Sequence, residues 1–269
     1  MTHATVGIIG GSGLYEIFDE ELESLVVATP YGEPSSPVSI GRIGDTVAAF
    51  LPRHGGGHSV PPHQINARAN AWALASLGVR AVVSTAAVGS INAELPPGAL
   101  VIPDQLVDLT WGRAGTFFDE GGVQHLPFAD PFDPVLRALA IAAAPEAAPT
   151  GTVGIISGPR FSTRAESRIY RSQGIDLLNM TLAPEVALAA ELGIGTVTLA
   201  VATDTDAGDD SDDPDGVTAE LVFRRLADAL PRIREIVLGT AAAIPADYAP
   251  RPLIDPAASA AVLERPVRR

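Results

Sequence analysis

The sequence predicts an α/β fold, because short apolar segments alternate with longer stretches of helix-like apolar spacing along its 269 residues. Hydrophobic residues make up 46% of the chain and aromatic residues only 5%, as expected of a globular protein with an aliphatic core. A chain of this length can bury such a core within one domain. We therefore expect a single domain over residues 1–244 and a Pro-rich C-terminal tail, residues 245–269, that is extended over the surface or frayed.

The strands are predicted from apolar runs that are bounded by Gly, Pro or polar turn residues. In chain order they cover residues 6–9, 37–43, 47–51, 81–85, 100–104, 153–156, 176–179 and 196–203. The first strand enters a Gly-rich turn, and the fifth follows the Pro- and Gly-containing turn at residues 96–98.

The helices are predicted where apolar residues recur every three to four positions. They cover residues 66–77, 133–143, 163–172, 184–192 and 218–243. Gly78 ends the first helix, Pro184 lies near the start of the fourth, and Pro231 predicts a kink in the last. Residues 109–131 are rich in Gly and aromatic residues and too long for a plain connection, so we expect them to have a functional or intersubunit role.

The composition excludes several kinds of chemistry. The chain has no Cys, which excludes disulfides, thiol nucleophiles and Cys-ligated zinc. It also has no Lys, so that all 18 Lys and Arg positions are Arg, and Schiff-base catalysis, pyridoxal phosphate attachment and the Walker lysine are excluded. A net charge of −14 disfavours nucleic acid and anionic membranes as partners. Because the chain has no Lys, any anion site must use Arg, His, hydroxyl groups and backbone N–H groups.

No apolar stretch reaches the length needed to span a membrane, and no basic-then-apolar leader precedes Val6. These features predict a cytoplasmic protein.

Three strand ends carry groups that could bind an anion. Residues 10–13 (GGSG) offer backbone N–H groups and the Ser12 hydroxyl, although a tight turn that requires Gly is an equal alternative. A dinucleotide-binding motif is not met, because its third Gly position is occupied by Glu16. Arg53 and His54 follow another strand, where Arg supplies a bidentate donor pair; a solvated strand-end Arg is the alternative. Small residues around Ala87 let the backbone approach a ligand closely, or serve packing alone.

A fourth strand ends in the acidic pair Asp204 and Asp206. Polar groups at the carboxyl edge of a sheet are typical of ligand sites in open α/β folds, whereas a metal site or a solvated turn is the alternative. The acidic residues 209–215 do not follow the register of a calcium-binding EF-hand loop. We expect them to form a flexible solvated loop that could cover the site.

Together these motifs resemble the methylthioadenosine phosphorylase and purine nucleoside phosphorylase family. The resemblance rests on residues 10–14 (GGSGL), 53–58 (RHGGGH), 158–167 (GPRFSTRAES), 179–181 (NMT) and 203–206 (TDTD), in the family's order and extending to about Leu238. It implies the nucleoside phosphorylase fold, with a mixed, partly barrel-like central sheet surrounded by helices. It also implies a homotrimer with sites at subunit interfaces and no metal or organic cofactor, inorganic phosphate being a co-substrate.

The resemblance assigns roles to individual residues. It implies phosphate binding by Ser12, Arg53, His54, Ala87 and Thr181, although Gly56 and Ala86 replace polar residues found in relatives. The remaining assignments concern the nucleoside: Met180 at the ribose, Phe161 stacked on the base, Ala219 and Phe223 at the 5′ group, and His125 lent by a neighbouring subunit. A core methionine and a surface histidine are the alternatives for Met180 and His125. Glu185 is interpreted only as a first-turn acid of a helix and is left out of the catalytic set.

Asp204 is predicted to be the catalytic acid that protonates N7 of the departing purine, which requires burial to raise the pKa of its carboxyl. Asp206 would accept from the 6-amino group and so favour adenine. The predicted reaction is phosphorolysis of 5′-methylthioadenosine to adenine and 5-methylthioribose 1-phosphate, a step of purine and methionine salvage. The alternatives are a phosphorylase of 6-oxopurine nucleosides or methylthioinosine, a nucleosidase that uses water, an inactive nucleoside-binding module and, least favoured, a dinucleotide-dependent oxidoreductase.

Overall fold

The computed structural model describes residues 3–11, 14, 17–18, 20–207 and 217–267. Its central element is a mixed sheet in which β1 (Val6–Gly10) lies parallel to β4 (Thr46–Pro52) and β5 (Ala81–Ser90). β5 also pairs in parallel with β10 (Gly195–Asp204) along nearly its whole length. Parallel strands buried on both faces require continuous apolar residues, and all ten residues of β10 are buried.

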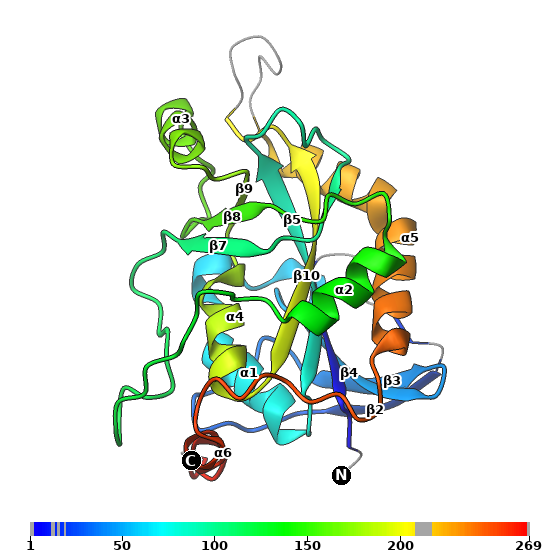
Figure 1. The fold of residues 1–269 in the computed structure, drawn as a ribbon, viewed down its shortest axis with the longest axis vertical. Coiled ribbons are helices and arrows are strands. Elements are labelled where there is room, and N and C mark those ends of the chain that lie inside the picture. Colours follow the sequence, from blue (N-terminus) through cyan, green and yellow to red (C-terminus); the bar gives the residue numbers. More distant parts are fainter. Residues whose placement is uncertain (1–2, 12–13, 15–16, 19, 208–216, 268–269) are drawn as a thin grey trace.

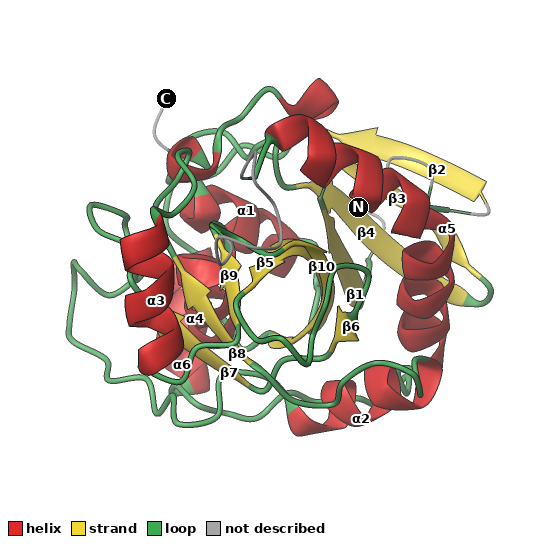
Figure 2. Ribbon diagram, turned by 90° about the horizontal axis from the view of Figure 1, so that it is seen from above, coloured by secondary structure: helices red, strands yellow, loops and turns green. Residues whose placement is uncertain are grey.

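The remaining strands complete the sheet in the order β2-β3-β4-β1-β5-β9-β8-β7, while β10 branches from β5 and pairs on its other side with β6. They are β2 (Glu20–Leu25), β3 (Val38–Ile43), β6 (Leu100–Val101), β7 (Gln105–Asp108), β8 (Thr152–Ile155) and β9 (Leu177–Asn179). In Figure 2 the strands around β5 and β10 curve into a nearly closed ring, from which β2 and β3 extend outward. The predicted α/β class and the mixed, partly barrel-like sheet are confirmed.

Six α-helices of the described residues surround this sheet (Figures 1 and 2). Side chains cap several of them: Asn66 accepts from Ala69 N at the start of α1, and Thr163 and Glu166 form a capping box at the start of α3. The helices are α1 (Ala67–Ser76), α2 (Pro134–Ala143), α3 (Arg164–Ser172), α4 (Leu182–Glu191), α5 (Ala219–Ala243) and α6 (Pro256–Leu263). Among the described residues, none of these helices combines the length and apolar character that crossing a bilayer would need.

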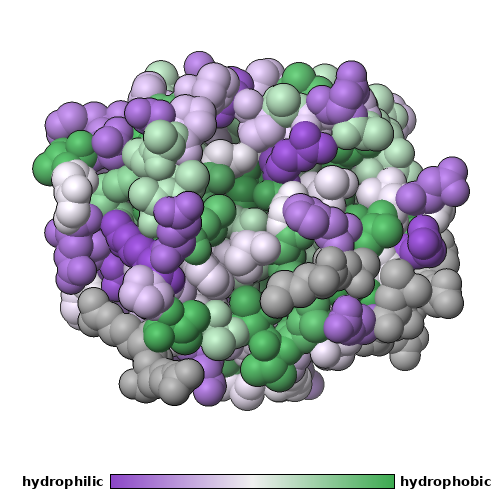
Figure 3. All heavy atoms as spheres, turned by 90° about the horizontal axis from the view of Figure 1, so that it is seen from below, coloured by the Kyte–Doolittle hydropathy of each residue, from purple (hydrophilic) through white to green (hydrophobic). Residues whose placement is uncertain are grey.

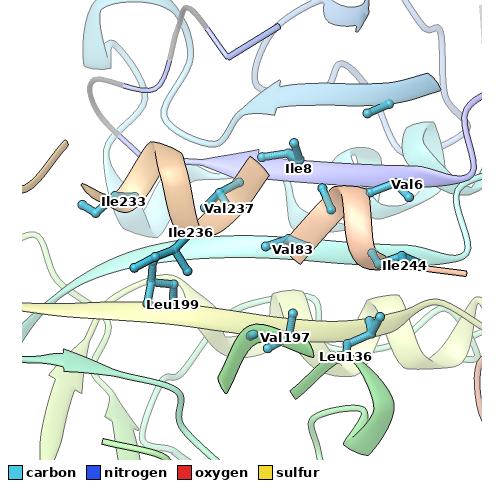
Figure 4. Packing of buried hydrophobic residues seen from close by; sticks show 14 of the residues in the cluster. Val6, Ile8, Val83, Leu136, Val197, Leu199, Ile233, Ile236, Val237 and Ile244 are labelled. Atoms are coloured by element: carbon cyan, nitrogen blue, oxygen red, sulfur yellow. The ribbon is translucent and has the colours of Figure 1, made fainter. Parts of the chain in front are cut away.

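The largest buried cluster lies between α5 and the sheet (Figure 4). Ile233, Ile236 and Val237 of α5 pack in one buried cluster with Val83 of β5 and Leu199 of β10. Burial of each such side chain contributes about 1.5–3 kcal/mol. This packing fixes α5 against the two strands whose ends carry the candidate site residues.

The C-terminal tail differs from its prediction. Residues 256–263 form α6 instead of an extended or frayed segment, capped by the Asp255 side chain and started by Pro256. The helix is tied to the domain by the Trp72 indole N–H, which donates to Val262 O at 3.1 Å. The tail and both labelled termini lie at the lower end of the molecule in Figure 1, where the surface mixes hydrophilic and hydrophobic side chains (Figure 3).

Three further differences concern the strands. The strand predicted for residues 100–104 is only β6, and the chain then forms a separate strand, β7, that pairs with β8 instead of β10. β2 was not predicted, and its partner is the antiparallel strand β3. β5 continues five residues beyond its predicted end, which carries its small residues into the site described next.

Candidate active site

A cavity of about 490 Å³ opens at the end of the sheet toward which β5 and β10 point in Figure 1. The carboxyl ends of these parallel strands meet at one edge of the sheet, and α5 closes one side of the cavity. The predicted site residues that line it are Arg53, His54, Ala87, Phe161, Met180, Thr181, Asp204, Asp206, Ala219 and Phe223. Ser12 lies outside the described residues, as does the acidic run 209–215. His125 is exposed and is not part of the lining.

Arg53, only 1% exposed, lies at the end of β4 and is held by three hydrogen bonds. Its Nε and Nη2 donate to the two carboxylate oxygens of Glu185 at 2.7 and 2.8 Å, and its Nη1 donates to Thr85 O at 2.8 Å. A guanidinium has five N–H donors, so these bonds leave one N–H on Nη1 and one on Nη2 among the described contacts. The interpretation of Glu185 as only a first-turn acid is therefore incomplete. The available signal was its position within the apolar residues 182–190, because a carboxylate on a buried helix needs a partner.

His54 is a neutral imidazole in this site. Its Nδ1 lies 3.0 Å from Val60 O, and because a carbonyl can only accept, Nδ1 carries the proton and Nε2 a lone pair. Burial, followed by the nearby Arg53 charge, lowers the pKa of His54 to about 4. The ring is stacked on His58 with centroids 4.2 Å apart, and His58 in turn meets the ring of Phe223 edge-on at 5.2 Å.

Asp204 ends β10 and is 3% exposed. Its Oδ2 accepts from the Thr203 hydroxyl at 2.8 Å, and its Oδ1 accepts from Asp206 N at 2.8 Å. These two bonds favour the carboxylate, but burial has the larger effect and raises the pKa of Asp204 from 3.8 to about 6. At neutral pH a fraction of the molecules therefore already carries a carboxyl able to donate a proton.

Asp206 adopts a backbone conformation with φ of +51°, which is uncommon for a residue other than Gly. Its carboxylate is buried, and Oδ2 has no hydrogen-bond partner among the described residues. An unpaired buried acceptor costs about 1–3 kcal/mol, so a donor that reached this oxygen would be stabilising.

Gly89 on β5 leaves the space that the two acids need. A Cβ at this position would lie 2.8 Å from Asp204 Oδ1 and 3.2 Å from Asp206 Cβ. The pairing of β5 with β10 shifts register between Ala202 and Asp204, next to this glycine. Sequence reasoning did not single out Gly89, because its role depends on which strand lies beside it.

Asn179, at the end of β9, organises a further part of the cavity lining. Its Oδ1 accepts from the backbone N–H groups of Thr181 and Leu182 at 2.7 and 2.9 Å, while its Nδ2 donates to Ala87 O at 3.0 Å. These bonds connect the start of α4 to β5 and fix Met180 between them. Gly158, with φ of +62°, borders Met180, where a Cβ would lie 2.5 Å from the Met180 sulfur.

One cavity thus contains three groups: a buried carboxyl whose pKa is raised to about 6, a second carboxylate that has an unpaired oxygen, and an Arg held by hydrogen bonds. Residues 5–239 match the family model described as the phosphorylase superfamily, and the chain belongs to this superfamily. Among curated relatives, it is 49% identical to the S-methyl-5′-thioadenosine phosphorylase of Mycolicibacterium smegmatis over 86% of this chain and 88% of the relative. It is 45% identical to the purine nucleoside phosphorylase of Streptomyces coelicolor, over 90% of each chain.

A solved structure supports the same assignment of fold. The methylthioadenosine phosphorylase of Schistosoma mansoni, solved in complex with adenine, is 36% identical and superimposes with a TM-score of 0.86 over 97% of each chain. The nucleoside phosphorylase fold implied by the sequence motifs is thus confirmed, and the chain is an enzyme of the pentosyltransferase type.

Proposed function

We propose that this enzyme catalyses phosphorolysis of 5′-methylthioadenosine to adenine and 5-methylthioribose 1-phosphate. The observation that carries the proposal is the pair Asp204 and Asp206, buried in the same cavity as Arg53 and His54. The names of the M. smegmatis and S. mansoni relatives support it.

In the proposed reaction, a phosphate oxygen forms a bond to C1′ while the bond from C1′ to the purine breaks. The electron pair of that bond goes to the purine ring, and the proton of Asp204 goes to N7. Arg53 supplies N–H donors to the phosphate, and the Nε2 lone pair of His54 can accept from a P–OH group. Inorganic phosphate is the only co-substrate in this proposal, which requires no metal and no organic cofactor, so activity should survive exhaustive treatment with a chelator.

The preference for adenine rests on Asp206. Its unpaired oxygen can accept a hydrogen bond from a 6-amino group, whereas a 6-oxo group would bring a second acceptor against it. Sites built to pair with a polar substrate group discriminate strongly against analogues that leave the site unpaired. The alternative function is a purine nucleoside phosphorylase that acts on 6-oxopurine nucleosides or methylthioinosine. It is retained because the S. coelicolor relative is named a purine nucleoside phosphorylase.

A substrate panel tests the proposal. We expect cleavage of 5′-methylthioadenosine only when phosphate is present, with kcat/KM for adenosine lower and that for inosine at least a hundredfold lower. The lower value for adenosine follows from the apolar residues Ala219, Val222 and Phe223 of α5 that line the cavity. The three kcat/KM values are obtained from the rates of adenine release from methylthioadenosine and adenosine and of hypoxanthine release from inosine. Preference for inosine would select the 6-oxopurine alternative, and equal turnover in phosphate-free buffer would select a nucleosidase.

We propose further that the enzyme is a cytoplasmic homotrimer of purine and methionine salvage in which His125 completes a neighbouring site. The exposed Trp111 (81%) and Val123 (74%) on the same segment as His125 support an intersubunit role for it. Light scattering should give the mass of three chains, and His125→Ala should raise KM for methylthioadenosine at unchanged mass. A monomer with full activity would contradict this proposal.

A further inference from the structure

Glu185 forms a buried ion pair with Arg53, although the two residues are 132 positions apart in the chain. The pair joins the end of β4 to the first turn of α4. Burial of two charges costs several kcal/mol per ion before their attraction is counted, so a buried ion pair is poor evidence of a role in stability. The pair therefore calls for another explanation.

The geometry of the pair supplies that explanation. Bidentate donation to Glu185 and a third bond to Thr85 O fix both the plane and the rotation of the guanidinium. Arg53 and Thr85 line the cavity, together with Thr181, the residue that precedes α4. Thr181 thus lies at the start of α4 and Glu185 in its first turn. Through Glu185, the helix fixes the position of the Arg53 guanidinium relative to Thr181.

We infer that Glu185 is a positioning residue for the phosphate co-substrate: it holds the Arg53 guanidinium in the one orientation that presents its two remaining N–H groups to the anion. The inference rests on the proposed function, in which phosphate occupies the Arg53 end of the cavity. Positioned donors convert binding energy into an oriented nucleophile, and small misplacements lower rates strongly.

The pair also cancels the charge of Arg53. Its partner is an anion and His54 is neutral, so the described groups at this end of the cavity provide donors without a net positive charge. If charge alone mattered, removal of the negative charge of Glu185 would strengthen phosphate binding and lower KM for phosphate. The positioning role predicts that the same change weakens phosphate binding and raises this KM, so an experiment can separate the two effects.

The test uses Glu185→Gln, with Glu191→Gln as the matched control. Both glutamates are buried on α4, but Glu191 accepts from Thr116 Oγ1 and Phe117 N and has no described contact with Arg53. In Glu185→Gln the amide NH2 faces an Arg N–H donor, so the guanidinium must turn. We expect KM for phosphate to rise at least tenfold and kcat to fall, with KM for the nucleoside changed less than twofold. Glu191→Gln should leave both KM values within twofold.

Two further variants keep the inference falsifiable. Glu185→Asp keeps a carboxylate on a shorter side chain and serves as the test if Glu185→Gln is poorly folded. Its KM for phosphate should lie closer to the wild-type value than that of Glu185→Gln. We expect the double variant Arg53→Lys, Glu185→Gln to have a KM for phosphate less than twofold higher than that of Arg53→Lys alone. The reason is that Glu185 acts through Arg53, so its replacement matters little once Arg53 is replaced. Additive losses, equal losses for both substrates, or a lower phosphate KM in Glu185→Gln would overturn the inference.

The inference and the proposed function fail in different ways. If the wild-type enzyme shows no phosphate-dependent cleavage, the proposed function is wrong. Calorimetric titration with inorganic phosphate still tests the positioning role in that case, with weaker binding by Glu185→Gln than by Glu191→Gln as the expected result and equal binding as the contrary one.

Discussion

Replacement of Asp204 by Asn is expected to lower kcat for phosphorolysis of methylthioadenosine by about 10²- to 10⁴-fold, the usual contribution of general acid catalysis. The amide keeps the shape of the side chain but has no proton of suitable acidity to give to N7. Steady-state rates at saturating phosphate measure the effect. Asp45→Asn, which changes an exposed Asp in the turn between β3 and β4, is the control and should leave kcat unchanged.

The same replacement should stabilise the protein at alkaline pH. The folded-state pKa of Asp204 is raised to about 6 from an ordinary 3.8, so the protonated carboxyl contributes stability fully below pH 3.8 and this contribution is lost as the pH rises through 6. A pKa difference of this size corresponds to about 3 kcal/mol. Thermal unfolding should show Asp204→Asn more stable than wild type at pH 8 and equal to it below pH 4. An equal melting temperature at pH 8 would show that the carboxylate is not penalised by burial.

Replacement of Arg53 by Lys is expected to lower kcat/KM for phosphate by about a hundredfold while KM for the nucleoside stays within about threefold. Lys keeps the positive charge but cannot reproduce the planar fork that engages Glu185 and Thr85 O and still presents two N–H groups to a ligand. Charge-assisted hydrogen bonds of this kind contribute about 1.5–3 kcal/mol each.

The control for this variant is Arg42→Lys, at an exposed position on β3. Initial rates with phosphate and nucleoside varied in turn separate the two KM values. Retention of full phosphate affinity in Arg53→Lys would mean that charge alone, rather than the oriented guanidinium, binds the anion. A parallel loss for both substrates would indicate a general structural defect.

Much of this site could be predicted from the sequence because strand ends are local features. The apolar run before Asp204 and the one before Arg53 each predict a buried strand, and parallel strands deliver their carboxyl ends to a common edge. The two residues accordingly line one cavity. Phe161 and Met180, assigned from family motifs, line the same cavity.

The parts that were missed depend on contacts between distant elements. The pairing of Glu185 with Arg53 requires α4 to lie beside the end of β4, and no local pattern shows this. Gly89 matters only because β10 lies next to β5. The error at α6 is of another kind: Asp255 and Pro256 before an Ala-rich segment are a helix-start signal, which the Pro content of the tail obscured.

The central claim is that the carboxyl of Asp204 gives its proton to N7 of the leaving purine. Cleavage of methylthioadenosine methylated at N7 tests it most directly, since this cationic base departs without needing a proton. Asp and Asn have nearly the same shape, so any crowding by the methyl group affects both enzymes alike. We predict that wild type and Asp204→Asn cleave this substrate at rates within about threefold of each other. If Asp204→Asn remains at least a hundredfold slower, Asp204 does not act as the acid and the proposed mechanism is wrong.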